Sequence, residues 1–259
     1  MSKFAVLGSP ISHSKSPVIH TAIFRELGED HSYQAFELAT DLSSYLSKLD
    51  DSWLGLSLTM PLKEQALDAA ERADFVAIQA QAVNTLIRTE SGWDGYNTDV
   101  FGIQKALLSK KFSSVAVLGT GATARSAIVA MLEAGKNVSV WGRSAEKAKS
   151  LAAEFEISVI DKLHTALSQP AVISTVVAGA LDDQLKNEYK GLLLDVIYHP
   201  WPTKLALHFP EKNRISGLEM LLWQAIGQQR LFHQLELDEP LQDEAKLVLA
   251  ARKALEMAK

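Results

Sequence analysis

The stretch Val115-Ala-Val-Leu-Gly-Thr-Gly-Ala-Thr-Ala-Arg125 lies near the middle of the 259-residue chain and decides its fold. Its pattern is typical of a buried strand, a glycine turn and the start of a helix. In such a turn Gly119 allows the tight reversal and Gly121 lets a pyrophosphate approach the backbone, while a small residue at Ala124 lets helix and strand pack closely. The pattern favours a dinucleotide site over a purely structural turn.

The helix that follows this turn offers unpaired N–H groups and a positive dipole end to phosphate. We therefore expect the first cofactor contacts from five residues, Gly119, Gly121, Ala122, Thr123 and Ala124.

The next strand ends in Ser139-Val-Trp-Gly-Arg143-Ser144, where an NAD enzyme usually carries an acidic residue for the ribose 2′-hydroxyl. Arg143 instead offers a planar cation suited to a 2′-phosphate, which favours NADP over NAD. Lys147, one turn further on, would add a second positive charge. In the alternative interpretation Arg143 is a solvated loop residue, Ser144 only caps the next helix, and Lys147 is an ordinary surface lysine.

A doubly wound sheet is predicted around this turn. Helices fill the gaps between five expected strands, at residues 115–118, 137–140, 158–160, 172–175 and 192–195. The domain boundary is expected near residues 105–114. After Ile215 the pattern is helical, with amphipathic stretches at 220–235 and 239–257.

The first hundred residues also alternate strands and helices. Strands are expected at residues 4–7, 33–37, 53–58 and 83–88, with helices at 17–27, 42–49 and 63–69 and a polar hairpin at 90–92. Such alternation predicts a largely parallel sheet. We therefore predict a two-domain α/β protein, with a substrate domain over 1–104 joined by the helices of 215–259, and a Rossmann-type domain over 105–214.

The composition excludes several classes of protein. A 47% hydrophobic and 22% charged chain is typical of globular proteins. With a net charge of −5 and no long basic run, neither nucleic acid nor an anionic membrane is an expected partner. The absence of cysteine excludes disulfides and thiolate chemistry, and His13 and His20 have no further ligands at a metal-site spacing, so no metal is assigned. We expect a cytoplasmic monomer or homodimer.

Several short segments resemble the shikimate dehydrogenase family along nearly the whole chain. They are Gly8-Ser-Pro-Ile-Ser-His-Ser14-Lys-Ser16-Pro-Val-Ile-His20, Gly55-Leu-Ser-Leu-Thr59-Met-Pro61-Leu-Lys63, Ala82-Val-Asn84-Thr85, Gly95-Tyr-Asn97-Thr-Asp99-Val-Phe-Gly102, Asp195-Val-Ile-Tyr198-His-Pro-Trp-Pro-Thr203 and Gly217-Leu-Glu-Met220-Leu-Leu-Trp-Gln224-Ala225.

The resemblance implies an NADP-dependent oxidoreductase that interconverts 3-dehydroshikimate and shikimate in chorismate and aromatic amino acid biosynthesis. It implies a catalytic role for Lys63 and Asp99. Reduction of a ring ketone needs a proton donor beside the developing alkoxide, and a lysine ammonium supplies both the proton and a stabilising charge. Asp99 would hold that ammonium and hydrogen-bond a substrate hydroxyl. The chemistry is expected in a cleft between the two domains.

A shikimate-type substrate presents one carboxylate and several hydroxyls. Ser14 and Ser16 suit the carboxylate, although without the resemblance they would be interpreted as a helix cap before Pro17. The resemblance also assigns other contacts. The substrate hydroxyls and ring would lie against Thr59, Asn84, Tyr198 and Gln224, and the cofactor against Thr175, Val196 and Gly217 in addition to the residues named above.

Three departures from the family pattern bear on specificity. Ser57 stands where many relatives have asparagine, Trp141-Gly142 replaces an asparagine before the arginine, and Ser174-Thr-Val-Val-Ala-Gly179 is a looser form of the segment near the nicotinamide. These departures leave the Lys63–Asp99 pair intact and bear on cofactor preference and substrate choice. Three alternatives stay open: a quinate or dual-specificity dehydrogenase using NAD, a non-catalytic NADP-binding sensor, which would have no chemical use for Lys63 and Asp99, and a folate-linked dehydrogenase of similar plan, which the Ser14, Ser16 and Gln224 segments do not support.

Overall fold

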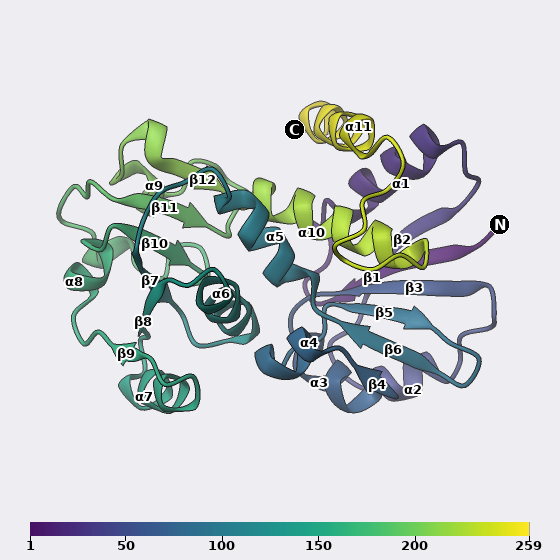
Figure 1. The fold of residues 1–259 in the computed structure, drawn as a ribbon, viewed down its shortest axis with the longest axis horizontal. Helices are drawn as coiled ribbons and strands as arrows, with labels where there is room; N and C mark the ends of the chain where they lie inside the picture. The colour runs from purple at the N-terminus through teal and green to yellow at the C-terminus, as the bar shows by residue number, and fades with distance from the viewer. Residues whose placement is uncertain (259) are drawn as a thin grey trace. The chain divides into compact units, whose positions relative to one another are not determined.

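The computed structural model describes residues 1–258, which form two compact units (Figure 1). The first unit comprises Met1–Gly102 and the chain from Leu221 onward, and the second comprises Ile103–Met220. Each unit has its own six-stranded sheet. Among the described residues, no helix combines the length and the apolar character needed to cross a membrane.

The sheet of the first unit is mixed, in the order β2-β1-β3-β5-β6-β4. Its strands are β1 (Lys3–Gly8), β2 (Ser32–Glu37), β3 (Trp53–Leu58), β4 (Arg72–Ala73), β5 (Thr85–Arg88) and β6 (Trp93–Tyr96). β1 pairs in parallel with β2 and β3, but β5 runs antiparallel to both β3 and β6. Three of the five strand pairs are parallel, as the sequence led us to expect, since β4 also pairs in parallel with β6. The tight hairpin at 90–92 makes β5 and β6 run in opposite directions.

Helices cover this sheet on both faces because successive side chains of β1 point to opposite sides. Phe4 and Val6 pack with Phe24, whereas Ala5 and Leu7 pack on the other face. The helices of the unit are α1 (Ser16–Leu27), α2 (Leu42–Leu46), α3 (Leu62–Ala69), α4 (Phe75–Ala80) and α11 (Glu244–Met257), with α5 (Thr98–Leu107) and α10 (Gly217–Phe232) shared with the second unit.

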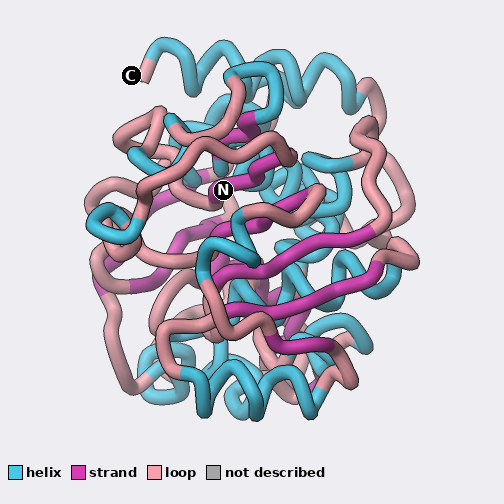
Figure 2. The backbone as a smooth tube through the Cα atoms, turned by 90° about the vertical axis from the view of Figure 1, so that its left-hand side faces the viewer, coloured by secondary structure: helices cyan, strands magenta, loops and turns pink. Residues whose placement is uncertain are grey.

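The sheet of the second unit is parallel throughout, in the order β12-β11-β10-β7-β8-β9. Its elements are β7 (Ser114–Leu118), α6 (Ala122–Glu133), β8 (Asn137–Trp141), α7 (Ala145–Glu154), β9 (Ser158–Val159), α8 (Leu163–Leu167), β10 (Ala171–Ser174), β11 (Leu192–Asp195), α9 (Lys204–Leu207) and β12 (Arg214–Ser216). Strand order reverses at β7, as in doubly wound nucleotide-binding sheets. The Rossmann-type prediction is confirmed. Figure 2 shows the strands flanked by helices.

Some element boundaries differ from the sequence-based expectations. The last helix begins at Glu244 instead of Glu239, because Pro240 lacks an N–H and disfavours helical backbone in the residue before it. The preceding helix runs over Gly217–Phe232 instead of 220–235. The short strands β4, β6 and β12 were not predicted, since two to four residues carry too little periodicity to be recognised.

Candidate active site and nucleotide site

The turn after β7 is built so that only glycine fits at position 119. Gly119 has φ +121°, and a Cβ placed there would collide with Thr175 Oγ1. Thr175 is held in this place because its hydroxyl and its N–H both donate to Leu118 O, at 2.8 and 2.9 Å. The structure thus brings the expected cofactor residue Thr175 to the glycine turn.

The start of α6 is open for a phosphate. Gly121 is the N-cap residue, it makes no side-chain capping bond, and no heavy atom lies within 4 Å of where its Cβ would be. The first-turn amides of Ala122 and Thr123 therefore have no side-chain cap, and Ala124 is fully buried against the sheet. An uncapped helix start beside open space fits the pyrophosphate of a dinucleotide.

The end of β8 carries exposed positive charge and no carboxylate. Arg143 and Lys147 are both exposed, and neither forms an ion pair with a residue that the structure describes. Ser144 is the N-cap of α7, and its hydroxyl accepts the Lys147 N–H at 3.3 Å. The capping role considered for Ser144 is therefore present, while the Arg143 guanidinium is free to meet a phosphate.

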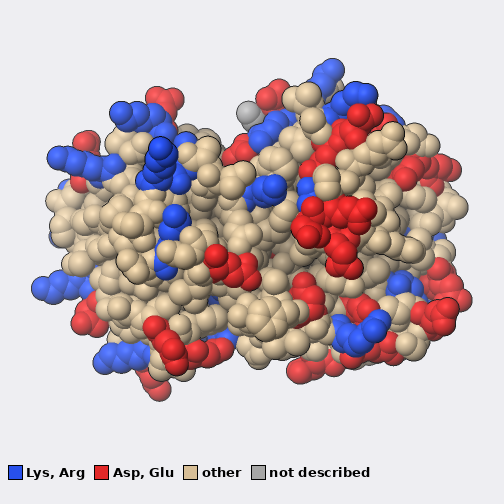
Figure 3. All heavy atoms as spheres, viewed as in Figure 1, with Lys and Arg blue, Asp and Glu red and all other residues tan. Residues whose placement is uncertain are grey.

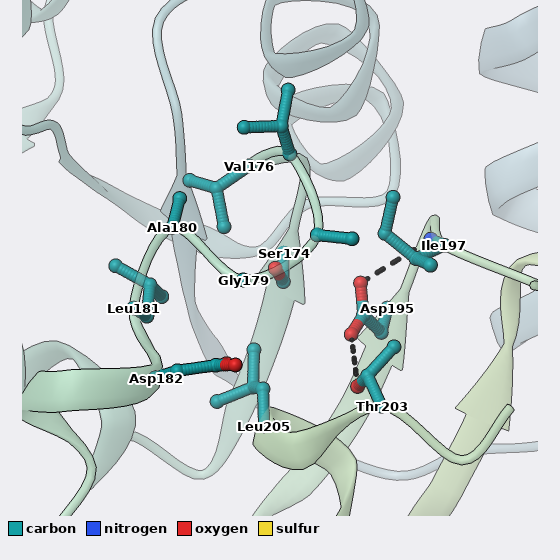
Figure 4. A pocket seen from close by; sticks show the side chains of 12 residues that line it. Ser174, Val176, Gly179, Ala180, Leu181, Asp182, Asp195, Ile197, Thr203 and Leu205 are labelled. Atoms are coloured by element: carbon teal, nitrogen blue, oxygen red, sulfur yellow. Dashed lines mark hydrogen bonds between the residues drawn. The ribbon is translucent and has the colours of Figure 1, made fainter. Parts of the chain in front are cut away.

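A buried carboxyl at the end of β11 orders the segment that follows it. Asp195 accepts hydrogen bonds from Thr203 Oγ1 at 2.7 Å and from the Ile197 N–H at 3.2 Å (Figure 4). Burial raises the pKa of Asp195 to about 6, and these hydrogen bonds oppose the rise. Asp195 holds the loop that carries Val196 and Tyr198, but the sequence analysis gave it no role of its own.

Gly217 allows α10 to start directly against this loop. A Cβ at Gly217 would collide with Val196 O, and the Gly217 N–H points to Ile197 O at 3.4 Å. The structure therefore brings together Val196 and Gly217, two of the residues expected to contact the cofactor. Only glycine permits this approach of two backbone segments.

A lysine and an aspartate form a close ion pair in the first unit. Lys63, at the start of α3, donates to Asp99, at the start of α5, with 2.5 Å between Nζ and Oδ2. Their side chains are 12% and 4% exposed. Asn97 caps α5 by accepting the N–H groups of Asp99 and Val100, at 3.0 and 3.3 Å. The pair is thus held by two helix starts.

Asn84 binds the other oxygen of Asp99. Its Nδ2 donates to Asp99 Oδ1 at 2.9 Å, and its Oδ1 accepts the Thr98 N–H at 2.8 Å and the Thr85 hydroxyl at 2.8 Å. Gln224 Oε1 lies 3.4 Å from the same Nδ2. Asn84 is only 1% exposed, so its carboxamide has to make its hydrogen bonds with protein groups. Through the bond to Asp99 Oδ1 it orients the aspartate.

The serine loop lies between β1 and α1. Lys15 is the N-cap of α1 and makes no side-chain capping bond, but Ser14 Oγ accepts the Ser16 N–H at 3.3 Å. Ser16 is buried. Ser14 is partly exposed and so accessible to a ligand.

Thr59 lies at the end of β3, beside the start of this loop. A Cβ at Gly8 would collide with Thr59 Cγ2, and the Thr59 N–H donates to Leu7 O at 2.9 Å. Position 8 therefore has to be glycine because the Thr59 side chain occupies the space that a Cβ would need.

The candidate residues divide between the two units. The first unit contains the ion pair and all but one of the expected substrate residues, namely Ser14, Ser16, Thr59, Lys63, Asn84, Asp99 and Gln224. The second contains every residue expected to bind the nucleotide, together with Tyr198. Among the described residues, no group of three or more acidic or histidine side chains is placed to hold a metal ion.

Charged side chains of both signs are interspersed on the face shown in Figure 3. Lys and Arg occur there singly or in small groups and form no continuous band.

A parallel nucleotide-binding sheet in one unit and a buried lysine–aspartate pair in the other define the class of the protein, a dinucleotide-dependent dehydrogenase. Residues 6–86 match the family described as shikimate dehydrogenase substrate binding domain, and residues 114–194 match that described as NADP oxidoreductase coenzyme F420-dependent.

Curated relatives match the chain over most of its length. The shikimate dehydrogenase (NADP(+)) of a Thermus thermophilus strain is 34% identical over 270 residues, which cover 98% of this chain and 99% of the relative. The same enzyme of Aquifex aeolicus is 32% identical, with 86% and 88% covered. The chain belongs to the shikimate dehydrogenase family.

Solved structures agree with this assignment. The crystal structure of shikimate 5-dehydrogenase from Thermus thermophilus in complex with NADP(H) and shikimate superposes with a TM-score of 0.85 at 32% identity, covering 98% of this chain and 100% of that one. The Aquifex aeolicus shikimate dehydrogenase gives a TM-score of 0.86 at 29% identity, with 98% and 97% covered.

Proposed function

We propose that this protein is an NADP-dependent shikimate dehydrogenase, which reversibly reduces 3-dehydroshikimate to shikimate. The observation that carries the proposal is the buried Lys63–Asp99 pair, with 2.5 Å between its charged atoms. A buried ion pair is costly to desolvate, and such pairs cluster at functional sites. Family membership and the NADP and shikimate named for the Thermus relative support the same reaction.

Lys63 and Asp99 have complementary roles in the proposed reaction. The Lys63 ammonium stabilises the alkoxide that develops on the substrate and exchanges a proton with it. Asp99 holds the ammonium in place and, through Asn84, keeps its second oxygen oriented. NADP(H), when bound, supplies or accepts the hydride.

The cofactor fits the second unit by the donor set around β7 and β8. The uncapped start of α6 would hold the pyrophosphate, with Gly121 allowing its approach, and Arg143 would hold the 2′-phosphate. Thr175, Val196 and Gly217 would line the rest of the cofactor site.

Ser14 and Ser16 would bind the substrate carboxylate, with Thr59 and Gln224 toward its hydroxyls. Neutral hydroxyl donors to a carboxylate contribute about 1–3 kcal/mol each, so Ser14→Ala/Ser16→Ala should raise KM for shikimate at least about tenfold. NADP affinity should not change, because the loop belongs to the first unit. A pure helix-capping role instead predicts a lower Tm with an unaltered KM, and that result would remove the carboxylate assignment.

The test of the proposed function is a spectrophotometric assay of NADPH formation with purified protein, shikimate and NADP. Quinate and NAD in the same assay separate the shikimate enzyme from a quinate or dual-specificity dehydrogenase. Binding of NADP without turnover of either substrate would identify a sensor and overturn the proposal. The folate-linked alternative gains no support from the family match.

We also propose a cytoplasmic protein that is a monomer or a homodimer. Cell fractionation tests the location, and light scattering after size-exclusion chromatography gives the mass to compare with the 28.3 kDa chain.

A further inference from the structure

A buried polar cluster lies behind the Lys63–Asp99 pair in the first unit. We call it the Gln228 cluster, and its members are His20 of α1, Tyr33 of β2, Ser57 of β3, and Gln228 and Gln229 of α10. Each of the five is less than a tenth exposed. Polar groups at this depth are costly unless their hydrogen bonds are made, so the orientation of each one is meaningful.

Gln228 uses its whole carboxamide within the cluster. Its Oε1 accepts from Ser57 Oγ at 2.8 Å and from His20 Nε2 at 3.1 Å. Its Nε2 donates to Asn84 O at 3.1 Å and to Thr85 Oγ1 at 3.0 Å. The Gln228 oxygen thus has two donors as partners and the Gln228 nitrogen has two acceptors, so only one orientation of the amide satisfies all four hydrogen bonds.

His20 is a further donor to this amide. The Asn84 carbonyl can only accept, so Gln228 Nε2 faces it and Gln228 Oε1 faces His20 Nε2, which therefore carries the proton of the neutral ring. His20 Nδ1, 2.8 Å from Gln229 Nε2, is then the acceptor. Burial lowers the pKa of His20 to about 3, and its hydrogen bond to Gln228 only partly opposes this shift. His20 is thus a neutral donor.

The Gln228 amide supports the hydrogen bonds that hold Asn84 toward Asp99, together with the Thr98 N–H, which donates to Asn84 Oδ1 at 2.8 Å. Because Thr85 Oγ1 accepts from Gln228, the single Thr85 proton is available for Asn84 Oδ1, which lies 2.8 Å away. With Oδ1 as the acceptor, Asn84 Nδ2 faces Asp99 Oδ1 at 2.9 Å. Gln228 also holds the Asn84 main chain through its carbonyl.

Tyr33 lies at the other end of the cluster. Its hydroxyl donates to Ser57 Oγ at 2.5 Å. The Tyr33 ring stacks on the His20 ring, with 4.2 Å between centroids and 8° between planes. Burial raises the pKa of Tyr33, so the hydroxyl keeps its proton for Ser57.

We propose that Gln228 is a positioning residue for the dehydrogenase reaction, whose carboxamide holds Asn84 against Asp99 and links that contact through Ser57 to Tyr33. The inference rests on the proposed function, because it assigns Gln228 to the same site. The hydrogen bonds of the Gln228 side chain go to His20, Ser57, Asn84 and Thr85, so its effect on Asp99 passes through Asn84.

Gln228→Met and Gln229→Met form a matched pair for the test. Methionine keeps the length of the side chain and loses the amide, and both glutamines are buried on α10. We expect Gln228→Met to lower kcat for shikimate about tenfold, since small losses of alignment are expensive at a reacting centre. Gln229→Met loses the contact with His20 and leaves the Gln228 carboxamide in place, so it should lower kcat by less than Gln228→Met does.

Gln228→Glu gives a readout that a merely structural role would not move. The protonated carboxyl can still donate one hydrogen bond toward Asn84 and Thr85, whereas the ionised carboxylate cannot. The titratable groups around position 228 are His20 and Tyr33, with Lys63 and Asp99 beyond Asn84, and burial among mostly neutral groups raises the pKa of an introduced carboxyl. The ratio of variant to wild-type kcat should therefore fall by about tenfold from about pH 6 to about pH 9.

Wild-type protein is assayed first with shikimate and NADP. If it shows no turnover, the proposed function and this inference both fail. If it turns over and Gln228→Met keeps its kcat, the inference alone is overturned. A kcat ratio for Gln228→Glu that does not change with pH would also overturn it, and this variant decides the question if Gln228→Met does not fold.

Discussion

The Arg143 guanidinium lies at the end of β8, exposed and without an ion-pair partner among the described residues. We predict that Arg143→Ala weakens NADP binding by about 1.5–3 kcal/mol, the range for a hydrogen bond to a charged group, and leaves NAD binding nearly unchanged. Titration calorimetry with both cofactors measures this. The control is Lys149→Ala, which removes another exposed positive charge, at a position on α7. Equal weakening of both cofactors would show that Arg143 does not bind the 2′-phosphate.

Lys63 and Asp99 act as one unit in the proposed mechanism. Lys63→Ala should lower kcat by roughly 10²-fold or more, because it removes an interaction with the transition state. NADP affinity should stay unchanged, because Lys63 belongs to the first unit and the nucleotide residues belong to the second. Asp99→Asn should also depress kcat, and the double variant should lose far less than the product of the two single losses. Steady-state kinetics of the four proteins completes the cycle. Multiplicative losses would indicate independent roles.

The β7–α6 turn contains two glycines with different physical requirements. Gly121 has an ordinary φ of −94°, and the space around its Cα is open. Gly121→Ala should therefore leave the unfolding free energy unchanged or raise it by about 0.4–1 kcal/mol, with Tm equal to or slightly above that of the wild type. The added methyl group would occupy the space proposed for the pyrophosphate. NADP affinity should therefore fall at least about tenfold, equivalent to one unfavourable contact of about 1.4 kcal/mol.

Gly119→Ala should behave differently, because the residue has φ +121° and a Cβ would collide with Thr175. We expect a lowered Tm for Gly119→Ala. Thermal unfolding and NADP titration on both variants separate the two glycines. If Gly121→Ala binds NADP normally, the pyrophosphate does not approach the helix start.

At the scale of the whole molecule, His20 should make folding stability sensitive to acid. The unfolded chain protonates this histidine near pH 6.5, but the folded protein does so only near pH 3, so the unfolded state binds more protons between these values. Wild-type stability should therefore fall as the pH drops, and His20 should account for about 2 kcal/mol of the loss between about pH 7 and pH 5.

Denaturant unfolding of wild type and His20→Gln at about pH 5, 6 and 7 measures this contribution. The variant should be less stable at neutral pH, and its deficit should shrink as the pH drops. His164→Gln, a change at an exposed histidine, should run parallel to wild type. A deficit for His20→Gln that stays constant over this pH range would contradict the prediction.

Local sequence was enough to predict the second unit closely. The glycine turn, the apolar strands and the missing acid before Arg143 are all features of neighbouring residues, and they predicted a parallel sheet that the structure contains. The first sheet was predicted less well. The hairpin at 90–92 was predicted, but its strands are only four residues long, and their periodicity does not reveal that β5 runs antiparallel to β3.

The amino-acid sequence by itself determined the fold class, the motifs and the identity of Lys63 and Asp99 as candidates, because each of these is written in residues close together along the chain. Only the tertiary structure decided that Asn84 orients Asp99, and that Gln228 connects Asn84 through Ser57 to Tyr33. Residues 33 and 228 are far apart in sequence, and neither belongs to a recognisable motif. Their importance comes from burial, which requires each polar group to find a partner and so fixes the direction of every hydrogen bond between them.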